Sequence, residues 1–472
     1  MTPGLIERVS ERKAYFILAS GMILWYFYSA FVATQVRYGF NQIGRLGLPI
    51  ASAVAVVAAG LIYLIKRRDI TDTAIPEPIP LRKLWLPAFA SALLLMPLFW
   101  FLKNGFINAD GLYNMQSLIS RVSILHHDEM LTTLLITRLW ESGICGIHPE
   151  ASFSMFSVVW GGFYVWVTVI LGGRLTGRRW PLFLILCFAS GFVQLFFGDV
   201  EFYAMVAALT SLYLLLSLEH LRGRISIIFP GLVLIFAILS HLLAGWLLPS
   251  YLFLFIRGLK RKEFAATLTS AFVMLIVAGF VFVIVTDAGL PIRAITRSHA
   301  MGSADKGFLD MLTQPSISYY ASVTNVLFLL FPFWFMIPLL IIYRRLYPSP
   351  YNVTVGICVV MLLLLAFVWN LGLGPYFDWN LIATIGVPAS ILVWGNLLQA
   401  PWIRGIRTAV WVLLLAGGIH SWVWISGNSL EFSFLPREHL GPLLESTSGS
   451  VLFDHRGPLL QNGHNPLSGD YQ

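Results

Sequence analysis

Residues 153–173 read FSMFSVVWGGFYVWVTVILGG, a run that contains no charged side chain. An α-helix needs about 20 apolar residues to cross the ~30 Å hydrocarbon core of a bilayer. Similar runs recur along the 472-residue chain, which is 57% hydrophobic and only 11% charged. Soluble domains carry about 25% charged residues, so a soluble globular protein is excluded. Since no alternating strands of a membrane β-barrel are visible, the sequence predicts an all-α polytopic transmembrane helix bundle.

Apolar runs between charged residues predict about thirteen membrane spans. The segment around Ser240, His241 and Gly245 leaves two alternatives, one long helix or two separate spans. The predicted spans lie near 14–35, 46–65, 84–102, 153–173, 180–197, 202–218, 225–240, 243–256, 264–286, 320–343, 352–369, 381–398 and 408–427.

The distribution of charge favours the version with two spans. With a cytoplasmic N-terminus, about two thirds of the 31 Lys and Arg residues fall on the inside, and most acidic residues fall outside. This positive-inside pattern predicts a multi-pass protein of the cell (inner) membrane with an extracytoplasmic C-terminus. The net charge of +8 then reports orientation, and it requires no nucleic-acid partner.

The predicted spans divide the chain into three parts. Residues 1–83 hold two leading spans and a Pro-containing cytoplasmic linker, residues 84–427 hold the main bundle, and residues 428–472 form an extracytoplasmic tail. The first large outer loop contains two amphipathic stretches, Leu112–Leu125 and Met130–Trp140, that can lie along the membrane interface. The three cysteines are widely separated, which argues against a disulfide framework and against a zinc site.

Several carboxylates are predicted at the outer mouth of the bundle, where an acid is costly unless it is hydrated, paired or metal-bound. Asp110 lies in FINADGLYNMQ (106–116), and Asp128 lies in ILHHDEM (124–130). A simple Asx turn or helix cap is the alternative for Asp110. The neighbouring His126 to Glu129 suggest a metal site, but adjacent helical residues diverge by about 100°, so one ion cannot easily take all four. No set of metal ligands in the sequence is specific, so the sequence leaves open whether the protein uses a divalent cation.

Asp199 and Glu201 lie in FFGDVEFYAM (196–205), at the predicted start of a span. There they either favour the helix dipole or hold a divalent cation bound to a lipid phosphate. Asp378 lies in GPYFDWNL (374–381), between two later spans.

Cations in the outer loops are candidates for contacting a phosphate. Arg293 and Arg297 lie in an outer loop with His299 and Lys306. Because positive charge outside runs against the topological bias, a role in binding phosphate is favoured. Arginine suits bidentate contacts to phosphate, while a solvated loop is the alternative. His241 lies at a predicted turn, where it either contacts a phosphate or sugar hydroxyl or caps a helix.

Together these motifs resemble the GT-C superfamily of integral-membrane glycosyltransferases. FINADGLYNMQ looks like the acidic catalytic motif of the first outer loop in that superfamily, and GDVEFY is similar to a later acidic motif. The D-W-N of GPYFDWNL resembles a DWD-type motif, with Asn380 in place of the last acid. The resemblance implies that residues 84–427 are a GT-C-like catalytic module that uses a polyprenyl-phosphate-linked sugar.

The predicted activity is inverting transfer of a hexosyl or pentosyl group to a glycan, lipid or protein acceptor on the extracytoplasmic face. Asp110 is the expected base, while Asp199, Glu201 and Asp128 position the site or a cation. Arg293, Arg297 and His241 are expected to contact the donor phosphate. The alternatives are a transporter or flippase for a lipid-linked or polar solute, and a non-enzymatic subunit of envelope polysaccharide assembly.

Overall fold

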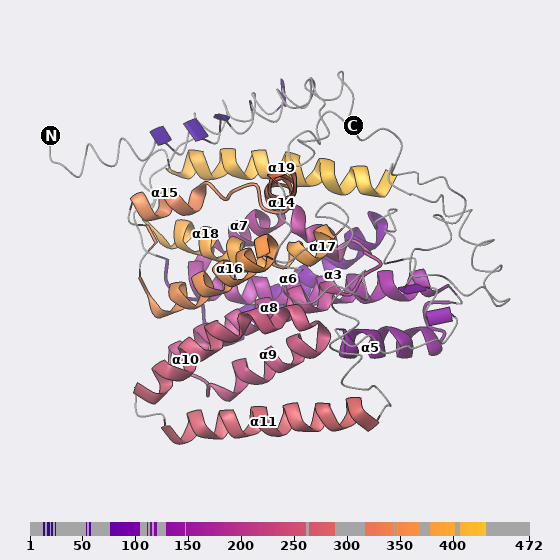
Figure 1. The fold of residues 1–472 in the computed structure, drawn as a ribbon. Coiled ribbons are helices and arrows are strands. Elements are labelled where there is room, and N and C mark those ends of the chain that lie inside the picture. The colour runs from indigo at the N-terminus through magenta and orange to yellow at the C-terminus, as the bar shows by residue number, and fades with distance from the viewer. Residues whose placement is uncertain are drawn as a thin grey trace.

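The computed structural model describes residues 76–103, 129–146, 148–260, 264–287, 317–343, 348–368, 378–401 and 406–430, with isolated positions between 13 and 57, between 111 and 119, and at 345–346. Within these ranges every regular element is a helix and none is a strand. Seven helical segments of the same ranges are long and apolar enough to cross a bilayer. The predicted all-α transmembrane bundle is therefore confirmed (Figure 1).

The helices are α3 (Leu81–Phe101), α5 (Met130–Glu141), α6 (Pro149–Thr176), α7 (Trp180–Phe188), α8 (Tyr203–Leu221), α9 (Ile228–Ser240), α10 (Leu248–Lys260), α11 (Phe264–Asp287), α14 (Ile317–Leu330), α15 (Met336–Ile342), α16 (Pro350–Val368), α17 (Trp379–Ala383), α18 (Gly386–Gln399) and α19 (Ile406–Leu430). Three short 3₁₀ segments join them: η3 (Gly177–Arg179), η4 (Gly191–Phe196) and η5 (Leu242–Leu247).

α8 lies in the core of the bundle, because 83% of its most apolar 18-residue stretch is buried. The corresponding share for α3 is 22%. α19 and α11 lie on opposite sides (Figure 1). Glycines allow α6 to approach its neighbours closely: a Cβ at Gly162 would lie 2.7 Å from Sδ of Met96 in α3. A Cβ at Gly161 would lie 2.7 Å from Cβ of Phe196 in η4.

Helices coincide with the predicted spans from 84–102 onward, but four of these spans are not one α-helix. In the span predicted at 180–197, α7 ends at Phe188 and η4 continues the crossing. The span predicted at 320–343 is broken into α14 and α15 by a turn at 332–335. The span at 243–256 begins in η5, and the span at 381–398 is divided into α17 and α18. The sequence missed these breaks because apolar composition does not distinguish an α-helix from a 3₁₀ segment or a turn buried among other helices.

The choice of two helices around His241 is confirmed. α9 ends at Ser240, His241 is extended with φ −164° and ψ 130°, and η5 leads into α10. The amphipathic stretch predicted at Met130–Trp140 is α5. The leading spans, most of Leu112–Leu125, and the tail at 428–472 lie almost wholly outside the described residues, so the three-part division stays a prediction.

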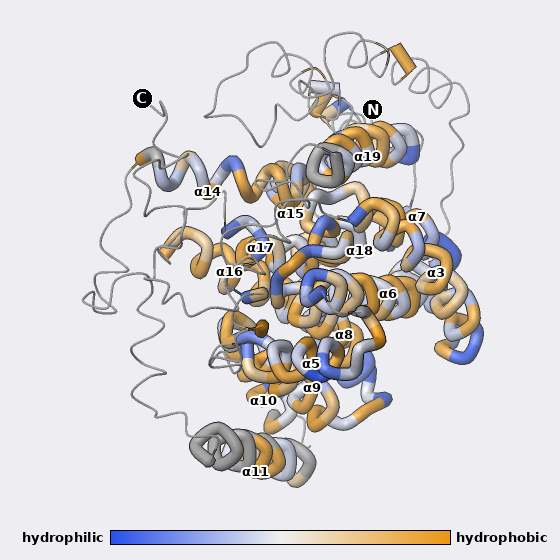
Figure 2. The backbone as a smooth tube through the Cα atoms, turned by 90° about the vertical axis from the view of Figure 1, so that its right-hand side faces the viewer, coloured by the Kyte–Doolittle hydropathy of each residue, from blue (hydrophilic) through white to orange (hydrophobic). Residues whose placement is uncertain are grey.

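Successive crossings of the bundle alternate in direction, with α7 and η4 together forming the crossing between α6 and α8. The bundle therefore has two distinct ends. At the end on the right of Figure 1, called the α5 end here, the last turn of α3 meets the starts of α6 and α8. At the other end, called the Arg174 end, α6 and α8 finish together and the start of α16 meets the end of α18. Figure 2 views the bundle from the α5 side and shows hydrophobic residues along most of its helices.

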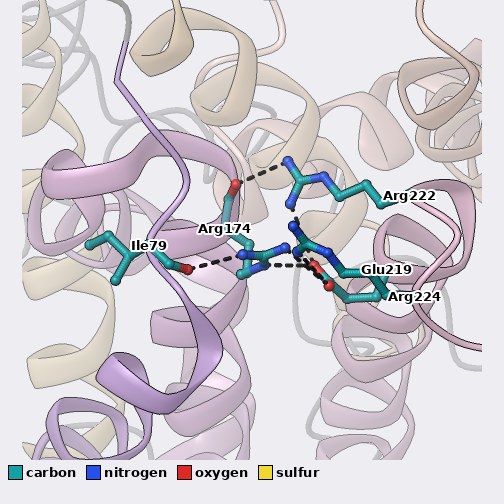
Figure 3. Close-up of polar contacts among 5 residues, drawn as sticks. All are labelled: Ile79, Arg174, Glu219, Arg222 and Arg224. Atoms are coloured by element: carbon teal, nitrogen blue, oxygen red, sulfur yellow. Dashed lines mark hydrogen bonds and ion pairs between the residues drawn. The ribbon is translucent and has the colours of Figure 1, made fainter.

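An ion cluster lies at the Arg174 end, with Arg174 and Glu219 buried and Arg222 and Arg224 exposed at its edge (Figure 3). Nε and Nη2 of Arg174 donate to the Glu219 carboxylate at 2.7 and 3.1 Å, and Nη1 donates to the carbonyl of Ile79 at 3.0 Å. Arg222 and Arg224 also donate to Glu219. The cluster ties α6 to α8 and to residues 76–80, which form the end of the predicted linker.

Candidate functional site

The acidic turn at 198–202 lies at the α5 end and is packed on several sides. Asp199 and Glu201 are only 5% and 4% exposed. Gly198 has φ +67°, and a Cβ there would lie 2.7 Å from Cβ of Lys103. Oγ of Ser154 in α6 donates to the Gly198 carbonyl at 3.0 Å. Buried carboxylates require compensation by charge, hydrogen bonds or ions, so this turn is the strongest candidate site in the described part of the chain.

Lys103 packs its Cβ against this turn and carries its positive charge toward the start of α6. Its Nζ lies 3.6 Å from the Glu150 carboxylate at the start of α6, and 4.9 Å from the centre of the Trp100 ring. Neither Lys103 nor Glu150 is among the site residues predicted from the sequence. One signal was present, because a lysine directly after α3 places positive charge on the predicted outer side, against the topological bias.

His241 and Glu129 form a second group of titratable residues at this end. Nε2 of His241 lies 3.3 Å from Oε1 of Glu129, and both residues are buried. Nδ1 of His241 accepts the Leu243 N–H at 3.0 Å, and the ring lies 4.7 Å from the ring of Tyr203. A ring nitrogen that accepts leaves Nε2 as the protonated nitrogen of a neutral imidazole. The cap expected as the simpler alternative for His241 is therefore present, while its predicted contact with a donor phosphate stays a prediction.

α5 is attached to the bundle next to this pair. Oγ1 of Thr132 donates to the carbonyl of Ser240 at 2.9 Å and lies 3.6 Å from Sδ of Met205. Thr132, Thr133 and Ile136 are buried on the inner face of α5. α5 is thereby fixed to the start of α8 and the end of α9, close to the acidic turn. Glu129 was missed as a contact because its partner lies far along the chain.

Four of the predicted site residues, Asp110, Asp128, Arg293 and Arg297, lie outside the described residues, so their roles stay predictions. Asp378 occupies the position before α17 and is half-buried. Asn380, which replaces an acid in the resembled motif, is buried, and its Oδ1 accepts the Leu381 N–H.

No group of three or more His, Cys, Asp or Glu residues that could hold a metal occurs in the part of the chain that the structure describes. Within that part, the site supplies buried carboxylates, a lysine and a neutral imidazole at one end of a membrane bundle. Such a set can orient hydroxyl groups, accept a proton and counter a developing negative charge.

No family model matches this chain, and no curated protein matches it. Two solved structures are similar. One is a crystal structure of ArnT from Cupriavidus metallidurans bound to undecaprenyl phosphate, with 15% identity, a TM-score of 0.49, and coverage of 73% of this chain and 77% of that chain. The other is ArnT from the same organism in the apo state, with 15% identity, a TM-score of 0.43, and coverage of 65% and 59%.

Proposed function

We propose that the protein is an inverting glycosyltransferase that moves a sugar from a polyprenyl-phosphate donor to an acceptor at the α5 end of the bundle. The observation that carries the proposal is the buried acidic turn, Asp199 and Glu201, packed against Lys103 at one end of a transmembrane bundle. The motif that contains Asp110 follows α3 directly, so it begins at the same end of the bundle.

The chemistry suits this location. A lipid phosphate stays in the membrane while its sugar reaches the aqueous boundary, so a site at the end of a bundle can hold both. The acceptor oxygen bonds to the anomeric carbon, the carbon–oxygen bond to phosphate breaks, and the hydroxyl proton passes to a carboxylate base. The lipid phosphate leaves with the bonding electron pair.

Asp110 is the proposed base. Asp199 and Glu201, with Asp128, position the reacting groups or a divalent cation, and no metal is assigned. Arg293, Arg297 and His241 are proposed to contact the donor phosphate. The two arginines supply positive charge that stabilises the departing anion, and the neutral His241 supplies a hydrogen-bond donor. Lys103 adds a cation at the same end. The α5 end would face the extracytoplasmic side of the cell membrane, as the charge distribution predicts.

The test is transfer of radiolabel from a panel of polyprenyl-phosphate hexoses and pentoses by purified protein in detergent. Asp110→Asn should lower transfer by about 10²-fold or more, the usual contribution of a general base. Glu141→Gln is the matched control, because Glu141 pairs with Arg138 on the exposed face of α5. Wild-type transfer by correctly folded Asp110→Asn would contradict the assigned base. Solute flux across proteoliposome membranes, with no transfer of sugar to an acceptor, would favour a transporter.

A further inference from the structure

Gln194 is a fully buried amide whose hydrogen bonds the described residues do not complete. Its side chain, in η4, is 0% exposed, and neither Nε2 nor Oε1 has a hydrogen-bond partner among the residues that the structure describes. An amide offers two donor hydrogens and one acceptor oxygen, and buried polar groups in folded proteins almost always have partners. The described residues therefore leave this amide available to bound water or to a ligand.

The surroundings of Gln194 follow from the packing of η4. A 3₁₀ helix has three residues per turn, so Gln194 lies one turn after Gly191 on the same face. A Cβ at Gly191 would overlap the carbonyl oxygen of Leu329 in α14. Nε2 of His420 in α19 also contacts that oxygen, at 2.7 Å. Three elements thus meet at the Leu329 carbonyl, and Gln194 lies one turn nearer the α5 end.

α19 and α17 place aromatic side chains at this level. Gly417 packs against the carbonyl of Ala189, and His420 contacts the carbonyl of Leu329, which also lies against Gly191. α19 therefore runs beside η4 in the same direction. Trp424, four residues after His420, is therefore on the same face, one turn nearer the α5 end. Its buried indole Nε1 has no hydrogen-bond partner in the described part of the chain, and its ring lies 5.8 Å from the ring of Trp379 in α17.

α14 adds a second amide to the same level. Asn325 is four residues before Leu329, on the same face, and is 8% exposed. Tyr320 precedes Asn325 in α14, and its ring contacts the ring of Phe367. Phe367 is near the end of α16, opposite the Arg174 end. Asn325 is thus displaced from Leu329 toward the α5 end, as Gln194 is. We name the four residues Gln194, Asn325, Trp379 and Trp424 the Gln194 layer.

The chemistry of the Gln194 layer identifies the class of ligand. None of its four side chains is charged, so it does not suit a phosphate, which favours Arg or Lys. Amide and indole groups exchange hydrogen bonds with hydroxyls, and indole rings supply an apolar wall, as in other small-molecule sites. A neutral, hydroxyl-rich ligand satisfies these requirements.

Accordingly, we propose that Gln194 and Trp424 bind the hydroxyl groups of the sugar carried by the lipid-linked donor, an inference that rests on the proposed glycosyltransferase function. The continuous buried segment Phe196–Phe202 links Gln194 to Asp199 and Glu201. The sugar would enter from the α5 end, with its hydroxyls on the Gln194 layer and its anomeric carbon nearer the carboxylates.

Thermal unfolding of the purified apo protein tests whether the amide lacks protein partners. Gln194→Leu should leave the unfolding midpoint unchanged or raised, because it removes a buried polar group without breaking a bond. Asn396→Leu is the matched control, since the amides of Asn396 and Asn352 bond each other at 2.7 and 3.1 Å. The control should lower the midpoint. An equal fall for Gln194→Leu would overturn the proposal.

Binding of polyprenyl phosphate with and without its sugar tests the ligand. Gln194→Leu and Trp424→Phe should each weaken binding of the sugar-bearing lipids by about tenfold, the effect of one lost hydrogen bond. Both variants should bind the sugarless lipid phosphate as the wild type does. Unchanged affinity for the sugar-bearing lipids, or equal loss for both ligands, would overturn the sugar site while leaving the proposed function standing. If no polyprenyl phosphate, with or without sugar, binds the wild type, the proposed function fails, and this inference fails with it.

Discussion

Nε2 of His241 lies 3.3 Å from Oε1 of Glu129, so the residue just before α5 faces the junction between α9 and α10. This contact links the start of α5 to the junction between α9 and α10, beside the acidic turn. It is a close electrostatic contact rather than a well-aligned hydrogen bond.

Glu129→Gln and His241→Ala should each lower sugar transfer, because either change loosens the attachment of the first outer loop to the bundle. The double variant should be no worse than the poorer single variant. Residues in direct contact typically show coupling of about 0.5–3 kcal/mol in a double-mutant cycle. The cycle is measured on unfolding midpoint and transfer rate together, and strictly additive effects would show that the two side chains act independently.

Gly198→Ala should destabilise the acidic turn by about 1 kcal/mol or more, since φ is positive and the new Cβ would meet Lys103. Gly143→Ala is the matched control. Gly143 has φ +68°, but a Cβ there meets nothing within 4 Å. Thermal unfolding of both variants separates backbone strain, common to both, from the contact with Lys103. Equal midpoints would show that this contact relaxes without cost.

Asp199→Asn and Glu201→Gln should lower transfer by about tenfold or more, because they remove the negative charge proposed to position the reacting groups or a cation. Sugar-transfer assays with and without a chelator distinguish positioning of the reacting groups from binding of a cation. A wild-type enzyme that loses activity on chelation, and variants that are already insensitive to it, would identify a cation held by these carboxylates. Full activity of both variants would remove the acidic turn from the site.

Glu219→Gln should destabilise the bundle by about 3–5 kcal/mol, because it leaves the buried guanidinium of Arg174 without its charge partner. Glu141→Gln removes an exposed pair with Arg138 and should change stability by about 1 kcal/mol or less. Unfolding midpoints in detergent measure both. If the two variants behaved alike, the Arg174 cluster would not be the main link between α6 and α8.

Local sequence patterns were sufficient for the helices. The apolar runs predicted α6, α8, α11 and α16, because span length depends on neighbours along the chain. The interruption at His241 left one helix or two possible, and the distribution of charge along the chain favoured two. The amphipathic pattern at Met130–Trp140 likewise predicted α5.

The acidic turn could also be found from the sequence, since acids at a membrane boundary are rare enough to be noticed individually. Its surroundings could not. Nothing in the local sequence indicates that Lys103 packs against Gly198, because that contact depends on how closely α3 approaches the turn before α8.

The sequence by itself determined that this chain is a bundle of transmembrane helices with acids concentrated near one end. Only the tertiary structure decided that Glu129 faces His241, that Arg174 and Glu219 pair, and that Gln194 is buried without a partner among the described residues. The reason is physical. Hydrophobic length is set by consecutive residues, whereas contacts between polar side chains on different helices depend on the rotation and depth of each helix in the bundle, which only packing among all of them specifies.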